Sequence, residues 1–250
     1  YTILDIEDQK KLIKQVLDYC KIDKDINESI YHIEIQKLKD NKILFNENKK
    51  ISKFSSLERL DDIYSYYQQR LIEINAVDFG DILLHSYSIL SNNQEIQKSY
   101  QNFIEHILID EFQDTNFIQN KWLNLLVNKN QNICCVGDDD QSIYSWRGAE
   151  IKNFLTFDQI YKNCKVFKLE QNYRSTKNIL ETASNLISNN SNRVGKKLWS
   201  SADQGELVKL NCYRTGKDEA QGICDIIEKK ISKKVRITID FSTIDRLSNA

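Results

Sequence analysis

The sequence predicts an α/β fold with parallel β-strands, and two acidic segments that end apolar runs are the main reason. Residues 107–109 lead directly into Asp110 and Glu111, and residues 133–136 lead through a glycine into three consecutive aspartates. Such runs are typical of buried parallel strands, whose carboxyl ends meet at the ligand-binding edge of an open sheet. A helical pattern at residues 118–127 separates the two runs, as expected for a parallel sheet.

The acids at the first strand end suit nucleotide hydrolysis. One carboxylate of the Asp110–Glu111 pair can hold Mg²⁺ while the other polarises a water molecule. Acids also occur at strand-to-helix junctions merely as caps, and without further context that interpretation is favoured. The sequence contains no G-x-x-x-x-G-K-[ST] phosphate-binding loop, so it predicts only part of an ATPase site.

Composition narrows the class of protein. The chain has 250 residues, of which 40% are hydrophobic and 28% charged, with a net charge of −1. This charge excludes a global basic field, so any nucleic-acid surface must be local. No apolar run approaches the roughly 18 residues of a membrane span, and no signal-like segment begins the chain. The six cysteines form no C-x-x-C pair, which favours reduced core residues over a disulfide scaffold or a zinc site, and predicts a cytoplasmic protein.

Residues 1–77 carry helical patterns. Asp5 is a candidate N-cap, and Ser55 with Glu58 forms the S-x-x-E pattern of a capping box. The apolar positions near the two caps repeat at helical spacing: Leu12, Ile13, Val16, Leu17 and Cys20 near the first, and Leu57, Leu60, Ile63, Tyr64, Tyr67, Leu71 and Ile74 near the second.

A lysine-rich stretch at residues 37–53 separates these two patterns. It includes Lys39, Lys42, Lys49 and Lys50. A solvated surface is the simpler interpretation, and a contact with nucleic-acid phosphates is the alternative.

The remaining elements continue the alternation. The pattern predicts a helix after Asp78, a strand at 166–169, a helix that opens near Thr176, a strand at 207–212 and a helix at 219–231.

Several further side chains suit a nucleotide or an unpaired base. The Gln141 amide can sense a phosphate, and Trp146 beside Arg147 pairs a stacking surface with a cation. Tyr173 beside Arg174 could stack a purine and neutralise a γ-phosphate. An ordinary core tryptophan and a helix start with a surface ion pair are the simpler alternatives.

Together these segments resemble the UvrD/PcrA/Rep group of superfamily-one DNA helicases. The resemblance runs from residue 3 to about residue 220, with the motifs in the order and spacing of that family. The matching segments are residues 78–83, 110–116, 137–149 and 169–176, with a weaker match at 192–199.

The resemblance implies a role for each residue of an ATP site. Asp110 corresponds to the Mg²⁺-binding acid and Glu111 to the catalytic base. Gln141 corresponds to the residue that couples the γ-phosphate to DNA. Tyr173 corresponds to the residue that stacks on adenine, and Arg174 to an arginine that reaches the γ-phosphate from the second motor domain.

The resemblance also implies a DNA site. Tyr144, Trp146 and Arg147 correspond to positions that contact single-stranded DNA or relay that contact to the ATP site. The implied activity is ATP-driven 3′-to-5′ movement on single-stranded DNA and at junctions of single- and double-stranded DNA, in repair or replication restart.

The implied architecture is a partial set of RecA-like P-loop NTPase parallel sheets with an all-helical insertion. Residues 1–77 would form the helical insertion of the first motor domain, residues 78–165 the later half of that domain, and residues 166–250 the beginning of the second.

The chain departs from the family in what it lacks. The family's phosphate loop and adenine-recognising Gln precede the region that matches, its later motifs follow that region, and residues 233–241 do not keep its pattern. Because the chain also lacks Met, we expect its amino terminus to be internal to a longer polypeptide. We expect activity to require that longer polypeptide. The isolated chain is therefore predicted to be inactive as an ATPase, and open sheet edges favour association.

Two alternatives stay open. The chain could belong to a helicase–nuclease subunit of the RecB or AddA kind, although Asp140 and Trp146 favour the UvrD group. It could instead be a non-catalytic remnant of a split gene that binds single-stranded DNA. The near-neutral net charge argues against strong DNA binding of this kind.

Overall fold

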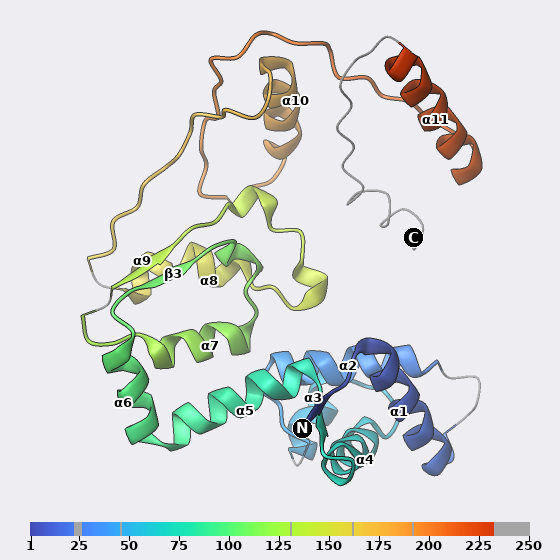
Figure 1. Cartoon of the computed structure of the whole chain (residues 1–250), viewed down its shortest axis with the longest axis vertical. Helices are drawn as coiled ribbons and strands as arrows, with labels where there is room; N and C mark the ends of the chain where they lie inside the picture. Colours follow the sequence, from blue (N-terminus) through green and yellow to red (C-terminus); the bar gives the residue numbers. More distant parts are fainter. Residues whose placement is uncertain (23–26, 46, 131, 162, 192, 233–250) are drawn as a thin grey trace. The chain divides into compact units, whose positions relative to one another are not determined.

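The computed structural model divides the chain into two compact units. It describes residues 1–232 apart from 23–26, 46, 131, 162 and 192, so the predicted departure at 233–241 lies outside the described residues. Unit 1 comprises residues 1–169 and 190–196, and unit 2 comprises residues 170–189 and those from 197 onward. Each unit is described by itself (Figure 1).

Unit 1 contains most of the regular structure. In chain order its described elements are β1 (Thr2–Ile3), α1 (Ile6–Tyr19), α2 (Glu28–Asp40), α3 (Asn48–Phe54), α4 (Leu60–Glu73), β2 (Ala76–Val77), α5 (Phe79–Asn92), α6 (Gln94–Phe103), β3 (Ile107–Ile109), the 3₁₀ turn η1 (Phe112–Asp114), α7 (Phe117–Leu126), β4 (Ile133–Cys135), the 3₁₀ turns η2 (Asp139–Gln141) and η3 (Ser145–Arg147), α8 (Ile151–Leu155) and α9 (Phe157–Ile160).

The main apolar core of unit 1 lies among α1, α2, α3 and α4. The Asp5 side chain accepts the Asp8 amide at 2.9 Å, which confirms the predicted cap of α1. The predicted apolar face of α1 is buried, and so are five of the seven apolar positions around α4. Burial of each such side chain contributes about 1.5–3 kcal/mol. The core cluster comprises Leu12, Ile13, Val16, Leu17, Cys20, Ile22, Tyr31, Ile35, Leu38, Ile51, Leu60, Ile63, Tyr64, Tyr67, Leu71 and Ala76.

The predicted capping box at Ser55 and Glu58 is wrong. Ser55 is the C-cap of α3, and its Oγ accepts the Leu57 amide at 3.3 Å. Helix α4 begins only at Leu60, after Arg59 in a left-handed conformation with φ 49°. The helical spacing of the apolar residues in α4 was therefore predicted correctly, but Ser55 ends α3 instead of capping the start of α4.

Lys39 is buried, which contradicts both interpretations of the lysine-rich stretch for this residue. Its Nζ lies 2.5 Å from Asp78 Oδ2 and 2.7 Å from Asp81 Oδ1, and the Lys39 side chain is 0% exposed. Tyr67 Oη donates to the same Asp78 oxygen at 3.0 Å. Burial raises the pKa of Asp78, but the ion pair and hydrogen bond with Lys39 outweigh it and hold that pKa below its usual range.

The other lysines of that stretch differ from Lys39. Lys42 Nζ donates to Tyr87 Oη at 2.8 Å, which ties the end of α2 to α5. Lys50 is exposed and pairs with Glu47, the N-cap of the same helix, as a solvated surface predicts. The Lys49 side chain lies outside the described residues.

The described residues form two small parallel sheets, and one of them contains both predicted acid-bearing strands. Strand β1 pairs with β2, and β3 pairs with β4 in a register that places Ile107 opposite Ile133. The ladder extends through the Val136 amide, which donates to the Ile109 carbonyl at 2.8 Å. Parallel pairing of the two predicted strands is thus confirmed. Their expected burial is wrong, because no residue of β3 or β4 is buried.

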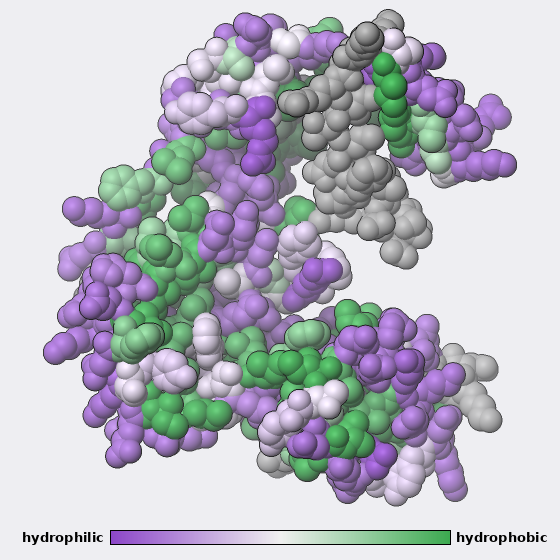
Figure 2. Space-filling model, in the orientation of Figure 1, coloured by the Kyte–Doolittle hydropathy of each residue, from purple (hydrophilic) through white to green (hydrophobic). Residues whose placement is uncertain are grey.

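One face of the β3–β4 sheet carries exposed apolar side chains. Leu108 is 80% exposed and Val136 52% exposed, and Cys134 on the same face is exposed too. The six cysteines were expected in the core, and that prediction holds only for Cys20. Cys135 and Cys164 are partly exposed, and Cys134, Cys212 and Cys224 are exposed. For Cys134 the reason is that no described residue covers this face. All six cysteines are free thiols. Figure 2 shows patches of hydrophobic residues among hydrophilic ones on the visible surface.

Unit 2 contains α10 (Lys177–Ile187) and α11 (Gly216–Ser232), which confirms both helices predicted there. Gln171 and Trp199 form an isolated parallel bridge. The strands predicted at 166–169, which fall in unit 1, and at 207–212 are wrong, because none of the described residues pairs with either segment as a neighbouring strand. Accordingly Leu169 is 83% exposed and Leu210 is 91% exposed. An apolar run without a hydrogen-bonded neighbour does not make a strand.

The structure is therefore a helix-rich fold with small parallel sheets. It agrees with the α/β prediction in combining helices with parallel strands. Among the described residues no helix has the length and apolar character needed to cross a membrane.

Candidate functional site

Asp110 and Glu111 lie at the carboxyl end of β3, where the sequence predicted them. Both side chains are exposed. Asp110 Oδ1 accepts the Glu111 amide at 2.9 Å, and Glu111 has a left-handed backbone with φ 50° and ψ 42°. A non-glycine residue in that conformation stores about 1–2 kcal/mol of strain.

Gln113 joins this acid pair to the second acidic segment. It is 1% exposed, and both ends of its side-chain amide are used. Its Nε2 donates to Glu111 Oε2 at 2.7 Å, and its Oε1 accepts the Asp138 amide at 2.9 Å. The loops after β3 and β4 are thereby held together by one buried side chain.

Gly137 makes room for this connection. A Cβ atom at this position would lie 2.6 Å from Gln113 Oε1 and 2.9 Å from a ring carbon of Phe154. Phe154 in turn lies beside Phe112, at a ring-centroid distance of 6.5 Å. The glycine is therefore required by the close approach of the buried amide and not by its own backbone angles.

The three aspartates at 138–140 and Gln141 form a compact polar turn. Their carboxylates offer oxygens within 4.8 Å of one another. Gln141 is exposed, and its Nε2 donates to Asp138 Oδ2 at 2.8 Å. This bond holds the Gln141 amide against Asp138, within its own turn.

Basic residues of the segment 190–196 neutralise this acidic turn. Arg193 donates to Asp140 through Nε at 2.8 Å and through a second nitrogen at 2.5 Å, and Lys196 donates to Asp138. Burial raises the pKa of Asp138, but the hydrogen bonds from Lys196 and Gln141 outweigh it and hold that pKa below its usual range.

Asp110 fits Mg²⁺ better than the three aspartates do. The oxygens of the acidic turn already accept hydrogen bonds from Arg193, Lys196 and the Val194 amide. The Asp110 carboxylate is exposed at a strand end and pairs with no described cation. A single accessible carboxylate with room for water is the kind of ligand that Mg²⁺ takes in phosphate-transfer sites.

Asp114 lies beside the acid pair with an unsatisfied oxygen. Its Oδ1 is buried and has no hydrogen-bond partner among the described residues. Burial, followed by the nearby charge of Glu111, raises the pKa of Asp114.

Tyr144, Trp146 and Arg147 come together around η3. The Arg147 guanidinium lies 4.7 Å from the Trp146 ring centroid and 5.4 Å from that of Tyr144. The two rings are 6.3 Å apart, and Trp146 is 61% exposed. The core interpretation of Trp146 is therefore wrong, and an exposed aromatic surface with an adjoining cation can stack on a base.

Tyr173 and Arg174 lie in unit 2, just before α10. Tyr173 is 83% exposed and donates through Oη to Gln171 at 2.7 Å. The Asn172 side chain accepts the amides of Arg174 and Ser175 at 2.9 and 2.8 Å, which fixes the turn that presents both residues. Arg174 is exposed as well. Both side chains are accessible to a ligand.

Sequence reasoning did not single out Gln113, Gly137, Asn116 or Asp40. Asn116 forms a capping box with Gln119 at the start of α7, a pattern that the sequence does show. Asp40 gives no local signal, because its contact with Asn116 joins residues 76 positions apart.

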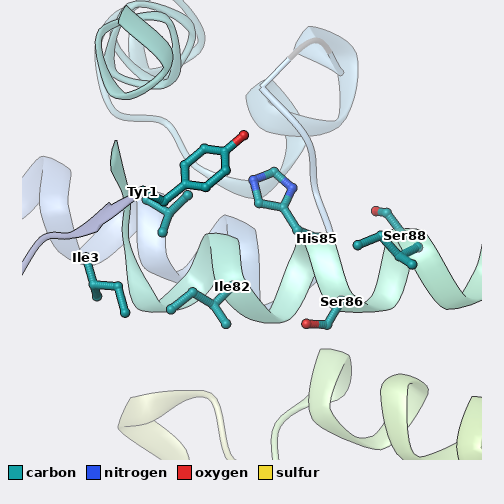
Figure 3. A pocket seen from close by; sticks show the side chains of 8 residues that line it. Tyr1, Ile3, Ile82, His85, Ser86 and Ser88 are labelled. Carbon is teal, nitrogen blue, oxygen red and sulfur yellow. The ribbon is translucent and has the colours of Figure 1, made fainter. Parts of the chain in front are cut away.

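A pocket of about 650 Å³ lies elsewhere, between the β1–β2 sheet and α5. Figure 3 shows Tyr1, Ile3, Ile82 and His85 among its lining side chains. None of the predicted site residues lines it.

The chain was compared with known proteins. Residues 1–162 match the family model of the UvrD/REP helicase N-terminal domain, and residues 167–244 match that of the UvrD-like helicase C-terminal domain. The second match reaches beyond residue 220, where the motif resemblance ended, and includes the tail in which we had expected the pattern to be lost.

Three relatives illustrate the similarity. A probable DNA helicase II homolog of Rickettsia felis is 42% identical over 233 residues, which cover 92% of this chain and 36% of the relative. The ATP-dependent DNA helicase PcrA of Staphylococcus epidermidis is 39% identical over 231 residues, with 92% and 32% covered. DNA helicase II of Haemophilus influenzae is 39% identical over 233 residues, with 91% and 31% covered.

This chain spans about a third of the length of those curated relatives. The N-terminal family model alone accounts for well over half of the chain. The chain therefore belongs to the UvrD/REP helicase family.

Proposed function

We propose that this chain is part of an ATP-dependent DNA helicase that moves 3′ to 5′ on single-stranded DNA. The observation that carries the proposal is the Gln113 side chain, which binds the Asp110–Glu111 loop to the Asp138–Gln141 turn. One loop offers acids for metal and water, and the other offers a neutral amide for a phosphate.

The phosphate chemistry divides among four side chains. Asp110 would hold Mg²⁺, which supplies charge neutralisation to the phosphates when bound. Glu111 would accept the proton of the attacking water, and its position is set by Gln113 Nε2 at 2.7 Å. Gln141 would contact the γ-phosphate with an amide that Asp138 orients. Arg174, which lies in unit 2, would neutralise charge on a nucleotide phosphate.

The base-binding chemistry relies on exposed aromatic rings. Tyr173, which is 83% exposed, would stack on adenine. Trp146 and Tyr144 would stack on unpaired bases, and Arg147, whose guanidinium lies beside both rings, would contact an adjoining phosphate. Because the chain has a net charge of −1, we expect this contact to be local and of modest affinity.

The proposal includes a requirement for the rest of the helicase polypeptide. The names of the relatives, DNA helicase II and PcrA, favour this function over a helicase–nuclease subunit. We propose single-stranded DNA and its junctions with double-stranded DNA as the substrates, and ATP with Mg²⁺ as the cofactors.

Binding of a labelled oligothymidylate, followed by fluorescence anisotropy, tests the DNA site directly. We expect Trp146→Ala and Arg147→Ala each to weaken binding about tenfold, since a stacked base contributes about 1–3 kcal/mol. Arg70→Ala removes a comparable exposed cation from α4 and should leave affinity unchanged. Equal affinity of all variants, or equal affinity for blunt duplex DNA, would refute the assignment of these residues.

A further inference from the structure

Asp40 ends helix α2 and faces two loops of the candidate site. Its Oδ1 accepts the side-chain amide of Asn116 at 2.8 Å. Within the described part of the chain no Lys or Arg forms an ion pair with it. Burial, partly offset by the Asn116 hydrogen bond and reinforced by the charge of Asp78, raises the pKa of Asp40 to about 6. The fold thus holds a poorly solvated carboxylate at this junction.

Asn116 connects Asp40 to both loops. Its Oδ1 accepts the Gln119 amide at 2.9 Å and so begins α7, directly after the acidic loop that follows β3. Its backbone forms an antiparallel bridge with Ala149. The next residue along, Glu150, donates its amide to the Thr115 carbonyl at 3.0 Å. Asn116, which binds Asp40, is therefore joined to the end of the turn that carries Tyr144, Trp146 and Arg147.

Gly148 brings that turn directly against Asp40. It ends η3 in a left-handed conformation with φ 81°. A Cβ atom at this position would lie 3.4 Å from Asp40 Oδ2 and 3.8 Å from Asp40 Cβ. One carboxylate oxygen therefore binds Asn116, and the other lies against the turn immediately after Arg147.

We propose that Asp40 is a positioning residue that anchors the Tyr144–Arg147 turn to helix α2, so that single-stranded DNA binding at this turn depends on it. The inference rests on the proposed function, because it concerns the same DNA-contacting residues. Asp40 itself touches no DNA. It acts by holding Asn116 and Gly148, and through them the conformation in which Trp146 and Arg147 are presented.

Two measurements on the 250-residue chain test the anchor. Hydrogen exchange reports on the amides of Gly148, Ala149 and Glu150, each of which donates a hydrogen bond within this junction. Oligothymidylate anisotropy reports on DNA affinity. We expect Asp40→Ala to accelerate exchange of these amides about tenfold and to weaken binding to a similar extent, as loss of one partly buried hydrogen bond predicts.

Matched variants separate an anchor from a general structural role. Asp40→Asn keeps an oxygen that can accept from Asn116, so it should restore both exchange protection and affinity. Asp18→Ala removes an exposed carboxylate from the end of α1 and should change neither. Amides of α1 and α4 should exchange at the wild-type rate in every variant.

The outcomes distinguish this inference from the proposed function. Unchanged exchange at 148–150 in Asp40→Ala would overturn the anchor whatever the DNA result. Faster exchange with unchanged affinity would overturn the dependence of DNA binding on it. If the wild-type chain bound no oligothymidylate, the proposed DNA site would be refuted, and so would the dependence of DNA binding on Asp40. The exchange data alone would then show whether Asp40 anchors the turn.

Discussion

Lys39 is a buried cation beside the helical core. Its ammonium group compensates two buried carboxylates, Asp78 at 2.5 Å and Asp81 at 2.7 Å. We expect Lys39→Met to lower the free energy of unfolding by about 3–5 kcal/mol, because it leaves both acids buried without a cation. Urea denaturation followed by far-UV circular dichroism measures the change.

The neighbouring Lys37 provides the matched control for this prediction. Its side chain is 44% exposed and pairs with Glu34 one turn away on the same helix. Lys37→Met should change stability by less than about 0.5 kcal/mol. If Lys39→Met were equally mild, water would have to reach the two acids, and the buried network would not hold.

Gly137 is expected to tolerate no side chain. Gly137→Ala would place a Cβ atom 2.6 Å from Gln113 Oε1, so the buried amide would have to move. We expect a loss of about 1–3 kcal/mol of unfolding free energy, with faster hydrogen exchange at the Asp138 amide. Gly216→Ala, where no atom lies within 4 Å of the added carbon, is the control. Retention of Asp138 protection in Gly137→Ala would contradict this account.

At the residue scale, sequence reasoning identified the exposed side chains of the candidate site and missed the buried side chains that position them. Asp110, Glu111, Trp146 and Tyr173 are exposed residues of unusual type in particular motifs, and such a signal is local. Gln113 belongs to one of those motifs, yet its role requires the amide of Asp138 from the other loop. Lys39 was misread because a lysine among polar residues is ordinarily solvated, and its two partners come 39 and 42 positions later.

At the scale of elements, the junction of α2 with α7 should respond to pH through Asp40. Its pKa of about 6 in the folded chain lies above the ordinary value near 3.9, so between these values the folded state keeps a proton that the unfolded state has lost. Stability contributed at this site is therefore greatest at low pH and falls as pH rises through about 4 to 6.

Asp40→Asn removes that dependence while keeping an acceptor for Asn116. We expect the variant to exceed the wild type in unfolding free energy by about 1 kcal/mol at pH 7.5, a value discounted for partial solvent screening, and by nothing at pH 4. Urea midpoints at both pH values measure the difference. A constant difference across that range would mean that the titrating group lies elsewhere.

Helix caps with a partner close in sequence were predicted in two cases, although the equally local Ser55–Glu58 pattern proved not to be a cap. Asp5 and Asp78 cap their helices through amides three residues ahead, so the sequence contains the whole signal. Strands β3 and β4 were recovered because each supplies the other's hydrogen bonds. Residues 166–169 have the same apolar character, but a strand is defined by a neighbour, which no window of the sequence can reveal.

At the scale of the whole molecule, the ATP site is expected to be incomplete. No phosphate-binding loop occurs in the sequence, so the β- and γ-phosphates lack their usual backbone amides and lysine. We expect the purified chain to hydrolyse ATP no faster than Asp110→Asn, with or without single-stranded DNA. Phosphate release measured with a coupled assay tests this. Hydrolysis that disappears in Asp110→Asn would show that other residues of this chain bind the phosphates.

The buried amide of Gln113 has a further consequence. Its two ends differ in polarity, and each meets a group of the opposite kind, so a half-turn of the amide would set donor against donor and acceptor against acceptor. Only one orientation is therefore allowed, and the separation of the two loops is fixed to the length of a single carboxamide. We expect any displacement of Glu111 to be accompanied by a correlated displacement of the Asp138 backbone, so that the two loops respond to a bound phosphate as one rigid body.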